Sequence, residues 1–328
     1  MDFILLIIGL VIIVKSADVL IDSSSKIARK YGVSTFVIGI TVIAFGTSAP
    51  ELVVGIMSAV NKTNQLALGN IIGSSYSNTA LIVGMAATMF PLAVKDSVVK
   101  REIPMLIFVQ CVLGFMILGD GKLTHLEGIL LLVGFAGFIA YVIINSKKTL
   151  KISIDAEGDL DTDGDGNMVE EKAKERSMLK LWIFSAVSLI GLFIGGKFAV
   201  DNSTKIAVSL GLSETLIGLT VVAIATTLPE LITSLMAVKK KEPDIVLGNC
   251  VGSNLFNILL VLGLSSFVNP IAVQGDMLFD VIFMVLLTVV VFAISLLAKR
   301  IPRLYGIALM SCYSVYICFK VMVTLSIF

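Results

Sequence analysis

Apolar runs of 17 residues or more recur along the whole 328-residue chain, and they limit its possible folds more than any other feature. A run of this length lets an α-helix cross a hydrocarbon core roughly 30 Å thick. Charged residues make up 15% of the chain, whereas soluble domains carry about a quarter. Segments of alternating polarity, which a transmembrane barrel needs, are absent from the sequence. The sequence therefore predicts an all-α polytopic membrane protein.

Ten transmembrane helices are predicted from these runs, in two sets of five. They fall at 3–22, 34–60, 66–90, 103–119 and 125–145, and at 180–200, 213–238, 245–267, 278–298 and 304–325. The one long polar stretch, 146–180, lies between the two sets. Lysine and arginine gather in alternate loops and leave the remaining loops only Lys62, Lys122 and Lys205. Because cytoplasmic loops carry the excess of basic residues, this predicts a multi-pass protein of the cell membrane with both termini outside and a cytoplasmic 146–180 loop.

An internal repeat runs through the chain. Glu51 and Glu230 lie 179 positions apart (230 − 51 = 179), and the same offset aligns about seventy residues without a gap. Roughly two in five of the aligned positions are identical, among them Asn70 with Asn249. Chance does not produce such a match, so the two halves are copies of one unit.

The predicted helix count sets the relation between the copies. Each half holds five helices, which is an odd number, so the second copy enters the membrane in the opposite sense to the first. The sequence therefore predicts two inverted five-helix repeats, 1–145 and 181–328, whose most similar parts are about 34–90 and 213–267. Inverted repeats are typical of secondary transporters, in which the substrate site lies near the bilayer midplane between the repeats.

Two acids stand at equivalent places in the repeats. Glu51 and Glu230 each lie in the middle of a predicted membrane helix, one residue after a proline. A carboxylate at that depth is unfavourable by several kcal/mol unless a partner compensates it, so an intramembrane acid indicates function. Hydroxyl groups share each acid's helix face three and four positions earlier, at Thr47, Ser48, Thr226 and Thr227. In the helices that follow, residues four apart are Ser74 with Asn78 and Ser253 with Asn257.

The prolines add further oxygen atoms. Pro50 and Pro229 each remove an N–H group and clash with the carbonyl four residues earlier, which leaves carbonyl groups without helical partners. A pocket of carboxylate, hydroxyl, amide and carbonyl oxygens suits a hard cation, and Ca²⁺ takes six to eight such ligands. Two carboxylates neutralise one Ca²⁺ and repel each other without it, so sodium ions or protons must replace it. This chemistry predicts an antiporter, and the alternative is a proton-sharing acid pair that only holds helices together.

The repeated motifs resemble a known family. The phrases GTSAPE (46–51) and ATTLPE (225–230), each followed by GNxxGSxxxN, are similar to the two alpha-repeats of the calcium/cation antiporter superfamily. They look most like its sodium/calcium exchanger branch in the prokaryotic form, and the resemblance covers most of the membrane part. It implies an exchanger of Ca²⁺ for Na⁺ that works by alternating access, with the first and sixth helices sliding against the rest.

The resemblance also implies roles for individual residues. Glu51 and Glu230 would bind calcium, with oxygen atoms from Thr47 and Thr226 beside them. Sodium sites would be completed by Ser48, Thr227, Ser74, Ser253 and the carbonyl groups of Ala44 and Ala223. Asn78 and Asn257 would line the centre.

Two positions depart from the family pattern. Ala225-Thr226-Thr227 replaces the usual Gly-Thr-Ser, which keeps the hydroxyl group and adds a methyl group that tightens a sodium site. Asn257 stands where some relatives carry an aspartate, which removes one charge. The proton-coupled branch usually shows Gly-Asn-Ala before its glutamate, and the absence of this sequence here favours sodium as the counter-ion.

Several other functions remain open on the sequence. Ca²⁺/H⁺ exchange would use the same glutamates as proton carriers. A passive cation channel and an intramembrane enzyme are more remote, since the chain has no HExxH motif and no paired catalytic aspartates. The predicted partners are the transported Ca²⁺ and Na⁺, or H⁺, and the lipid bilayer; no permanent cofactor, nucleic acid or obligate protein partner is expected.

The polar loop contains DLDTDGDGNMVEE, which resembles an EF-hand calcium loop. The candidate ligands are Asp159, Asp161, Asp163, Asp165 and Glu170. A register that starts at Asp159 puts Glu170 at the twelfth position but a glycine at the apolar one, and a register that starts at Asp161 ends on a lysine. The stretch is therefore either a disordered acidic linker or a regulatory calcium sensor.

The first helix carries its own charges. Lys15 and Asp18 are three positions apart, a spacing that allows them to pair within the helix. Asp22 and its repeat counterpart Asp201 lie near helix ends, where we expect water to solvate them.

Overall fold

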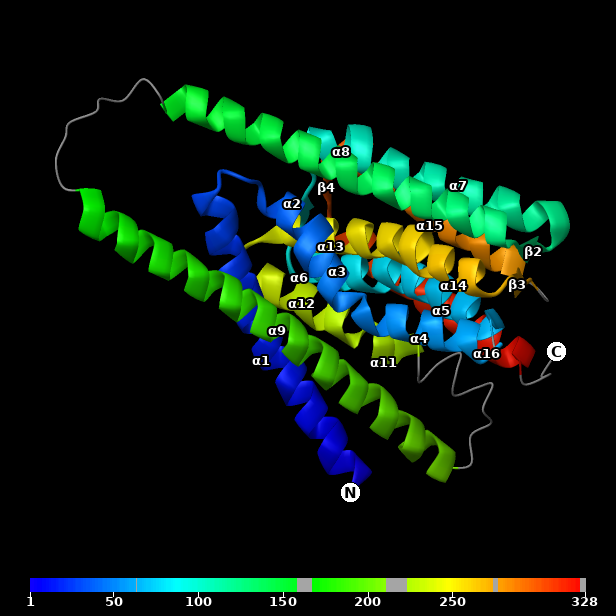
Figure 1. Cartoon of the computed structure of the whole chain (residues 1–328). Helices are drawn as coiled ribbons and strands as arrows, with labels where there is room; N and C mark the ends of the chain where they lie inside the picture. The colour runs from blue at the N-terminus through cyan, green and yellow to red at the C-terminus, as the bar shows by residue number, and fades with distance from the viewer. Residues whose placement is uncertain (63, 158–166, 211–222, 274–276, 325–328) are drawn as a thin grey trace.

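The computed structural model describes residues 1–62, 64–157, 167–210, 223–273 and 277–324 (Figure 1). The first half consists of α1 (Asp2–Lys30), α2 (Thr35–Ile38), the π-helical segment η1 (Gly39–Ile43), α3 (Ala44–Thr47), α4 (Ala49–Val60), α5 (Asn64–Tyr76), η2 (Ser77–Ile82), α6 (Val83–Met89), η3 (Val98–Glu102), α7 (Ile103–Asp120) and α8 (His125–Glu157). The second half consists of α9 (Asn167–Ser209), α11 (Ala223–Thr226), α12 (Leu228–Lys239), α13 (Pro243–Leu255), η5 (Phe256–Leu262), α14 (Gly263–Val268), α15 (Met277–Ala298) and α16 (Arg303–Thr324).

The repeat in the sequence is also a repeat in the structure. Adding 179 to the bounds of α3, α4 and α5 gives the bounds of α11, α12 and α13 without any shift. Two short antiparallel ribbons join the halves at their ends. In them β1 (Leu92–Ala93) pairs with β4 (Arg300–Ile301), and β2 (Lys122–Leu123) pairs with β3 (Ile271–Ala272).

By length and composition, seven of the described helices can cross a membrane, or eight if the bent pair Thr35–Thr47 and Ala49–Val60 is one span. The prediction of an all-α membrane protein is confirmed, but the count of ten spans is not reached by this measure. Segment 223–239 is short because 211–222 lies outside the described residues. Segment 64–89 mixes its apolar residues with serine, asparagine and threonine, which lowers its hydropathy.

Three helices extend beyond the predicted bounds. Helix α1 runs to Lys30 instead of 22, α8 runs to Glu157 instead of 145, and α9 begins at Asn167 instead of 180 (Figure 1). The apolar runs end where the lipid ends, but a helix continues into water because its hydrogen bonds are made within the segment. Much of the polar stretch between the halves is therefore helical, and only 158–166 lies outside the described residues.

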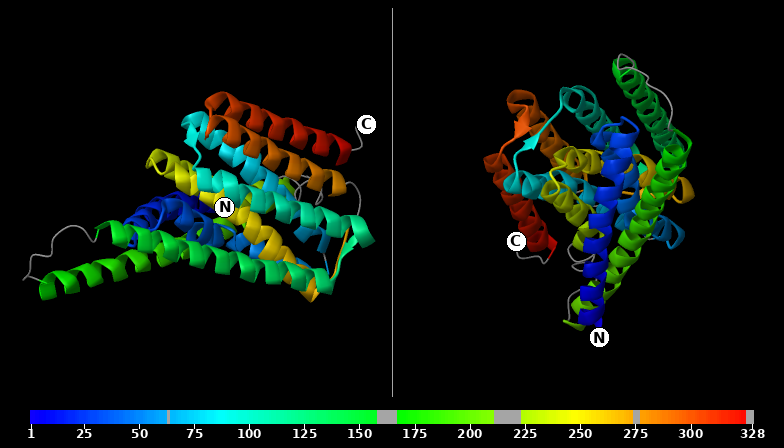
Figure 2. Two further views of the ribbon diagram at one scale, coloured as in Figure 1. Left: turned by 90° about the horizontal axis from the view of Figure 1, so that it is seen from above. Right: turned by 90° about the vertical axis from the view of Figure 1, so that its left-hand side faces the viewer.

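Helices α1 and α9 lie against each other along one side of the bundle (Figure 2). A Cβ atom on Gly9 would lie 2.9 Å from the carbonyl oxygen of Gly195, so only glycine permits this close approach. Further along, Ser185 Oγ donates a hydrogen bond of 2.9 Å to Ser23 Oγ. Because residue numbers rise along α1 as they fall along α9, the two helices are antiparallel, as counterparts in inverted repeats must be.

Helix α9 crosses the points where the glutamate-bearing segments break. A Cβ atom on Gly196 would lie 3.5 Å from Pro50 Cγ and 3.3 Å from Pro229 Cγ. The opposite side of the breaks is formed by α13 and α14. The most apolar part of the span Pro243–Val268, to which both belong, is 94% buried and forms the centre of the molecule. The α1–α9 pair therefore covers one face of the two breaks, and the bundle covers the other.

Candidate cation site

Each glutamate lies in the first turn of a short helix, just after a break in the chain. Helices α4 and α12 begin at Ala49 and Leu228, each with proline as the second residue. The break bends the first segment by 46°. The mid-helix position expected for Glu51 and Glu230 was therefore wrong, because the proline interrupts the helix as its missing N–H group and ring require. A helix N-terminus carries a partial positive charge, which favours a carboxylate there.

Both carboxyl groups are buried, and each has one oxygen atom without a partner. Glu51 is 0% exposed and Glu230 is 1% exposed. Ser74 Oγ donates to Glu51 Oε1 at 3.5 Å, and Ser48 Oγ donates to Glu230 Oε1 at 3.3 Å. The Oε2 atom of each acid has no hydrogen-bond partner. Since Ser48 belongs to the first repeat and Glu230 to the second, the two breaks meet at this point.

The threonines beside the acids donate hydrogen bonds across the repeats. Thr47 Oγ1 donates to Asn249 Oδ1 at 3.1 Å, and Thr226 Oγ1 donates to Asn70 Oδ1 at 3.3 Å. Each of these bonds ties the residue before one break to an asparagine of the other repeat. Asn70 and Asn249 were not among the predicted site residues, although their match in the repeat was the signal that could have identified them.

The support behind these two asparagines differs between the repeats. Asn249 Nδ2 donates to Ser234 Oγ at 3.3 Å. The repeat counterpart of Ser234 is Gly55, and Asn70 Nδ2 has no partner. Asn249 is therefore held by two side chains, whereas Asn70 is held by one.

The predicted residues of the following helices are buried, and several of their polar atoms are unpaired. Ser253 Oγ and both amide atoms of Asn257 have no partner, and neither has Asn78 Oδ1. Asn78 Nδ2 donates to Asn254 Oδ1 at 3.0 Å. Asn78 and Asn257 lie in the π-helical segments η2 and η5, an irregularity often found at functional sites.

Two of the remaining predicted ligands, Ala44 and Thr227, already have bonds within their own segments. The carbonyl oxygen of Ala44 accepts from Ser48 N at 3.0 Å and from Thr47 Oγ1 at 3.4 Å. Thr227 Oγ1 donates to the carbonyl oxygen of Ile224 at 3.2 Å. Ala223 is the first residue of α11.

The predicted calcium loop is not assembled by the described residues. Asp159, Asp161, Asp163 and Asp165 lie outside them, and Glu170 lies within α9, where a helix replaces the expected loop. In the part of the chain that the structure describes, no cluster of three or more His, Cys, Asp or Glu residues could hold a metal ion. A cation between the repeats would therefore rely on two acids together with hydroxyl and amide oxygens.

A cavity of about 150 Å³ reaches the breaks from one side. It lies between α4 and α9, beyond the prolines in the direction of Lys62 and Lys205. Its lining consists of Pro50, Val53, Val54, Phe193, Lys197, Val200, Asp201 and Thr226.

Comparison with known proteins adds independent evidence. Residues 1–144 and 180–322 match the model of a family described as "Sodium/calcium exchanger protein". The chain is 35% identical over 266 residues to the inner membrane protein YrbG of Escherichia coli, which covers 81% of this chain and 79% of that protein. It is 30% identical over 347 residues to the sodium/calcium exchanger MaX1 of Methanosarcina acetivorans, which covers 96% and 97% of the two chains.

A solved structure shares the fold along nearly the full length. The sodium-calcium exchanger NCX_Mj, soaked with 10 mM Na⁺ and zero Ca²⁺, superposes with a TM-score of 0.82 at 26% sequence identity. The match covers 97% of this chain and 98% of that one.

Proposed function

The chain belongs to the sodium/calcium exchanger protein family and is a cation/Ca²⁺ antiporter of the membrane; we propose that Na⁺ is its counter-ion and that Glu51 and Glu230 are the ligands for which the ions compete. The observation that carries this proposal is the pair of fully buried acids, each with an unpartnered Oε2 atom. A buried carboxylate without a compensating positive charge is destabilising by several kcal/mol, and a bound cation supplies that charge.

Calcium would bind between the two breaks. Glu51 and Glu230 supply two negative charges, which one Ca²⁺ balances, and Thr47 and Thr226 supply hydroxyl oxygens that lie beside Asn249 and Asn70. Hydroxyl, amide and carboxylate oxygens are the ligands that Ca²⁺ prefers, in a flexible geometry of six to eight.

Sodium would replace calcium by occupying the neutral oxygens around the same acids. Ser48 Oγ and Ser74 Oγ each lie within hydrogen-bond distance of one of the two glutamates, and Ser253 Oγ is buried and unpaired. Two carboxylates are balanced by two monovalent ions as well as by one divalent ion. The two kinds of ion therefore exclude each other, which is the requirement for exchange.

We place both termini outside the cell and the 146–180 region in the cytoplasm. This orientation follows the clustering of basic residues, for example at Lys239 to Lys241, in alternate loops. It puts the cavity between α4 and α9 on the outer side, so this conformation would take up ions from outside.

Proteoliposomes that contain the purified full-length chain test the counter-ion. We expect an outward Na⁺ gradient to drive Ca²⁺ uptake with the membrane voltage clamped at zero and a protonophore present. Uptake that follows an imposed pH gradient instead, and that the protonophore abolishes, would establish Ca²⁺/H⁺ exchange. Calcium flux that continues after all counter-ions are withdrawn would indicate a channel.

A further inference from the structure

Alternating access requires the α1–α9 pair to change its contacts. These helices cover the breaks, and one cavity reaches the breaks between α4 and the Lys197 end of α9. The opposite end of α1 is tied to the bundle by ion pairs. Any conformation that opens this second side must break them.

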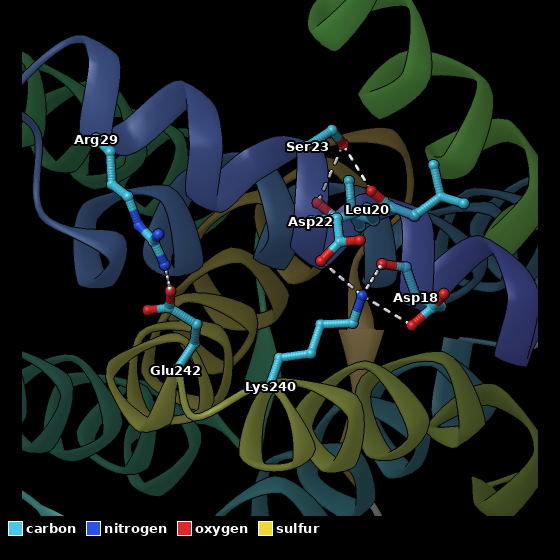
Figure 3. Close-up of polar contacts among 8 residues, drawn as sticks. Asp18, Leu20, Asp22, Ser23, Arg29, Lys240 and Glu242 are labelled. Carbon is cyan, nitrogen blue, oxygen red and sulfur yellow. Dashed lines mark hydrogen bonds and ion pairs between the residues drawn. The ribbon is translucent and has the colours of Figure 1, made fainter.

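The ion pairs join α1 to the turn between α12 and α13 (Figure 3). Lys240 Nζ lies 2.8 Å from Asp18 Oδ1 and 2.7 Å from Asp22 Oδ1, and it also donates to the carbonyl oxygen of Asp18 at 2.8 Å. Arg29 pairs with Glu242 at 2.5 Å. Asp18 pairs with this lysine from the second repeat, not with Lys15 as the spacing allowed. Asp22 remains exposed to water, as expected, and also pairs with Lys240.

The lysine at the centre of this cluster is well enclosed. Its side chain is 20% exposed, while those of Asp18 and Asp22 are 46% and 56% exposed. Burial lowers the pKa of Lys240, but its hydrogen bonds to Asp18 and Asp22 outweigh burial and raise that pKa above its usual value. The lysine therefore remains charged throughout the physiological range.

The repeat offers a direct comparison with the other side of the membrane. The offset of 179 relates Lys240 to Asn61, Asp18 to Lys197 and Asp22 to Asp201. The two turns have the same backbone, since the next residues, Lys62 and Lys241, have φ values of 59° and 60°. Yet an asparagine replaces the lysine and a lysine replaces one aspartate. Within the described ranges, neither Lys197 nor Asp201 forms an ion pair.

We propose that Lys240 with Asp18 and Asp22, and Arg29 with Glu242, form a one-sided latch. The latch holds α1 against the α12–α13 turn, keeps the site closed on the Lys240 side, and has no equivalent on the Lys62 side. The state that is open on the Lys62 side is therefore the more populated one. This inference depends on antiport by alternating access, but it does not depend on which counter-ion is used.

The size of the effect follows from exposure. Each ion pair of this kind shifts an equilibrium by roughly 1.5- to 5-fold. Loss of both Lys240 pairs is therefore expected to shift the ratio of the two open states by about two- to 25-fold toward the state that is open on the Lys240 side.

Two cysteine reporters measure the ratio of the state open on the Lys240 side to the state open on the Lys62 side. The full-length chain is placed in proteoliposomes after its four native cysteines are replaced. Val53→Cys lies in the described cavity, and Ile232→Cys is its repeat counterpart on the Lys240 side. With Lys240→Asn we expect a membrane-impermeant thiol reagent to modify Ile232→Cys about two- to 25-fold faster from the Lys240 side. Modification of Val53→Cys from the other side should slow. Lys239→Asn removes the same charge from the same turn without breaking the latch, and is the matched control.

A reverse experiment transfers the latch. Asn61→Lys combined with Lys197→Asp recreates the lysine and two aspartates at the Lys62 end, and should slow modification of Val53→Cys. The latch is refuted if Lys240→Asn changes the labelling rate of neither reporter more than Lys239→Asn does. It is also refuted if Lys240→Arg, which keeps the charge, changes the labelling rates as Lys240→Asn does. Thiol labelling needs no ion flux, so a failure of Na⁺-driven transport would leave this test decisive.

Discussion

Replacing Glu51 with glutamine removes one negative charge from the candidate site and almost nothing else. The side chain is 0% exposed, its Oε1 atom accepts from Ser74, and its Oε2 atom has no partner. Glutamine keeps the shape and the Ser74 contact, but it has one carbonyl oxygen and an amide group in place of two carboxylate oxygens. A cation bound there would lose half of its compensating charge.

The magnitude follows from the burial of the site. Removing one partner of a buried ion pair is destabilising by about 3–5 kcal/mol. With 1.4 kcal/mol per tenfold change, the affinity for Ca²⁺ should fall by about 100- to 4,000-fold. Glu230→Gln should have an effect of similar size, because Glu230 is also buried and also has an Oε2 atom without a partner.

Isothermal titration and thermal unfolding of the purified chain measure this loss. Calcium at 100 times the wild-type Kd stabilises the wild type by about 2.7 kcal/mol, and at the same concentration should stabilise the variant by about 0.4 kcal/mol or less. Glu102→Gln is the matched control, since Glu102 is 9% exposed and its Oε1 atom accepts from Tyr141 OH at 3.0 Å, away from the breaks. If Glu51→Gln binds Ca²⁺ within threefold of the wild type, the assignment of the site is wrong.

Three other substitutions or deletions have defined outcomes. Asn257→Ala removes two unpaired amide atoms and should raise the Na⁺ concentration needed for half-maximal exchange more than the KM for Ca²⁺, as a flux assay against both ions will measure. Ser234→Ala removes the acceptor of the Asn249 amide group and should raise the KM for Ca²⁺ by roughly two- to tenfold with kcat unchanged. Its control is Ser295→Ala, which removes an unpaired buried hydroxyl elsewhere and should leave the KM unchanged. Deletion of 155–171 should leave Na⁺-driven Ca²⁺ uptake intact, and a loss of uptake at saturating Ca²⁺ would contradict this expectation.

The features that could be predicted from the sequence are those that depend on local chemistry or on the repeat. Apolar length identified the membrane class, and the 179-residue offset identified the relation between the halves. Proline chemistry predicted carbonyl groups without helical partners before each glutamate, which stays a prediction, and the structure ends a helix at Thr47 so that Glu51 lies in the first turn of the next one. Apolar length could not locate the ends of α8 and α9, because polar residues continue a helix in water.

Contacts between the repeats could not be predicted in the same way. The bonds from Thr47 to Asn249 and from Lys240 to Asp18 join residues more than two hundred positions apart. They exist only because the two copies pack against each other. The helix spacing that relates Thr47 to Glu51 says nothing about such partners.

The positions at which the two repeats differ determine which of the two open states is more populated. If the two copies were identical, the states open to either side would have equal free energy in a symmetric bilayer without voltage, and half of the molecules would face each side. A resting preference must therefore come from positions at which the copies differ. Among the charged residues of the latch, these positions include Lys240 against Asn61 and Asp18 against Lys197.

Interchanging these four residues tests whether they are sufficient. Lys240→Asn, Asn61→Lys, Asp18→Lys and Lys197→Asp together preserve the net charge and leave Glu51 and Glu230 untouched. The exchanged chain should favour the state open on the Lys240 side by about the factor by which the wild type favours the state open on the Lys62 side. A tenfold preference of this kind corresponds to a free-energy difference of about 1.4 kcal/mol. The Ile232→Cys and Val53→Cys reporters should then exchange their reactivities while calorimetry shows unchanged Ca²⁺ affinity. Retention of the wild-type labelling pattern would mean that the preference arises from other differences between the copies.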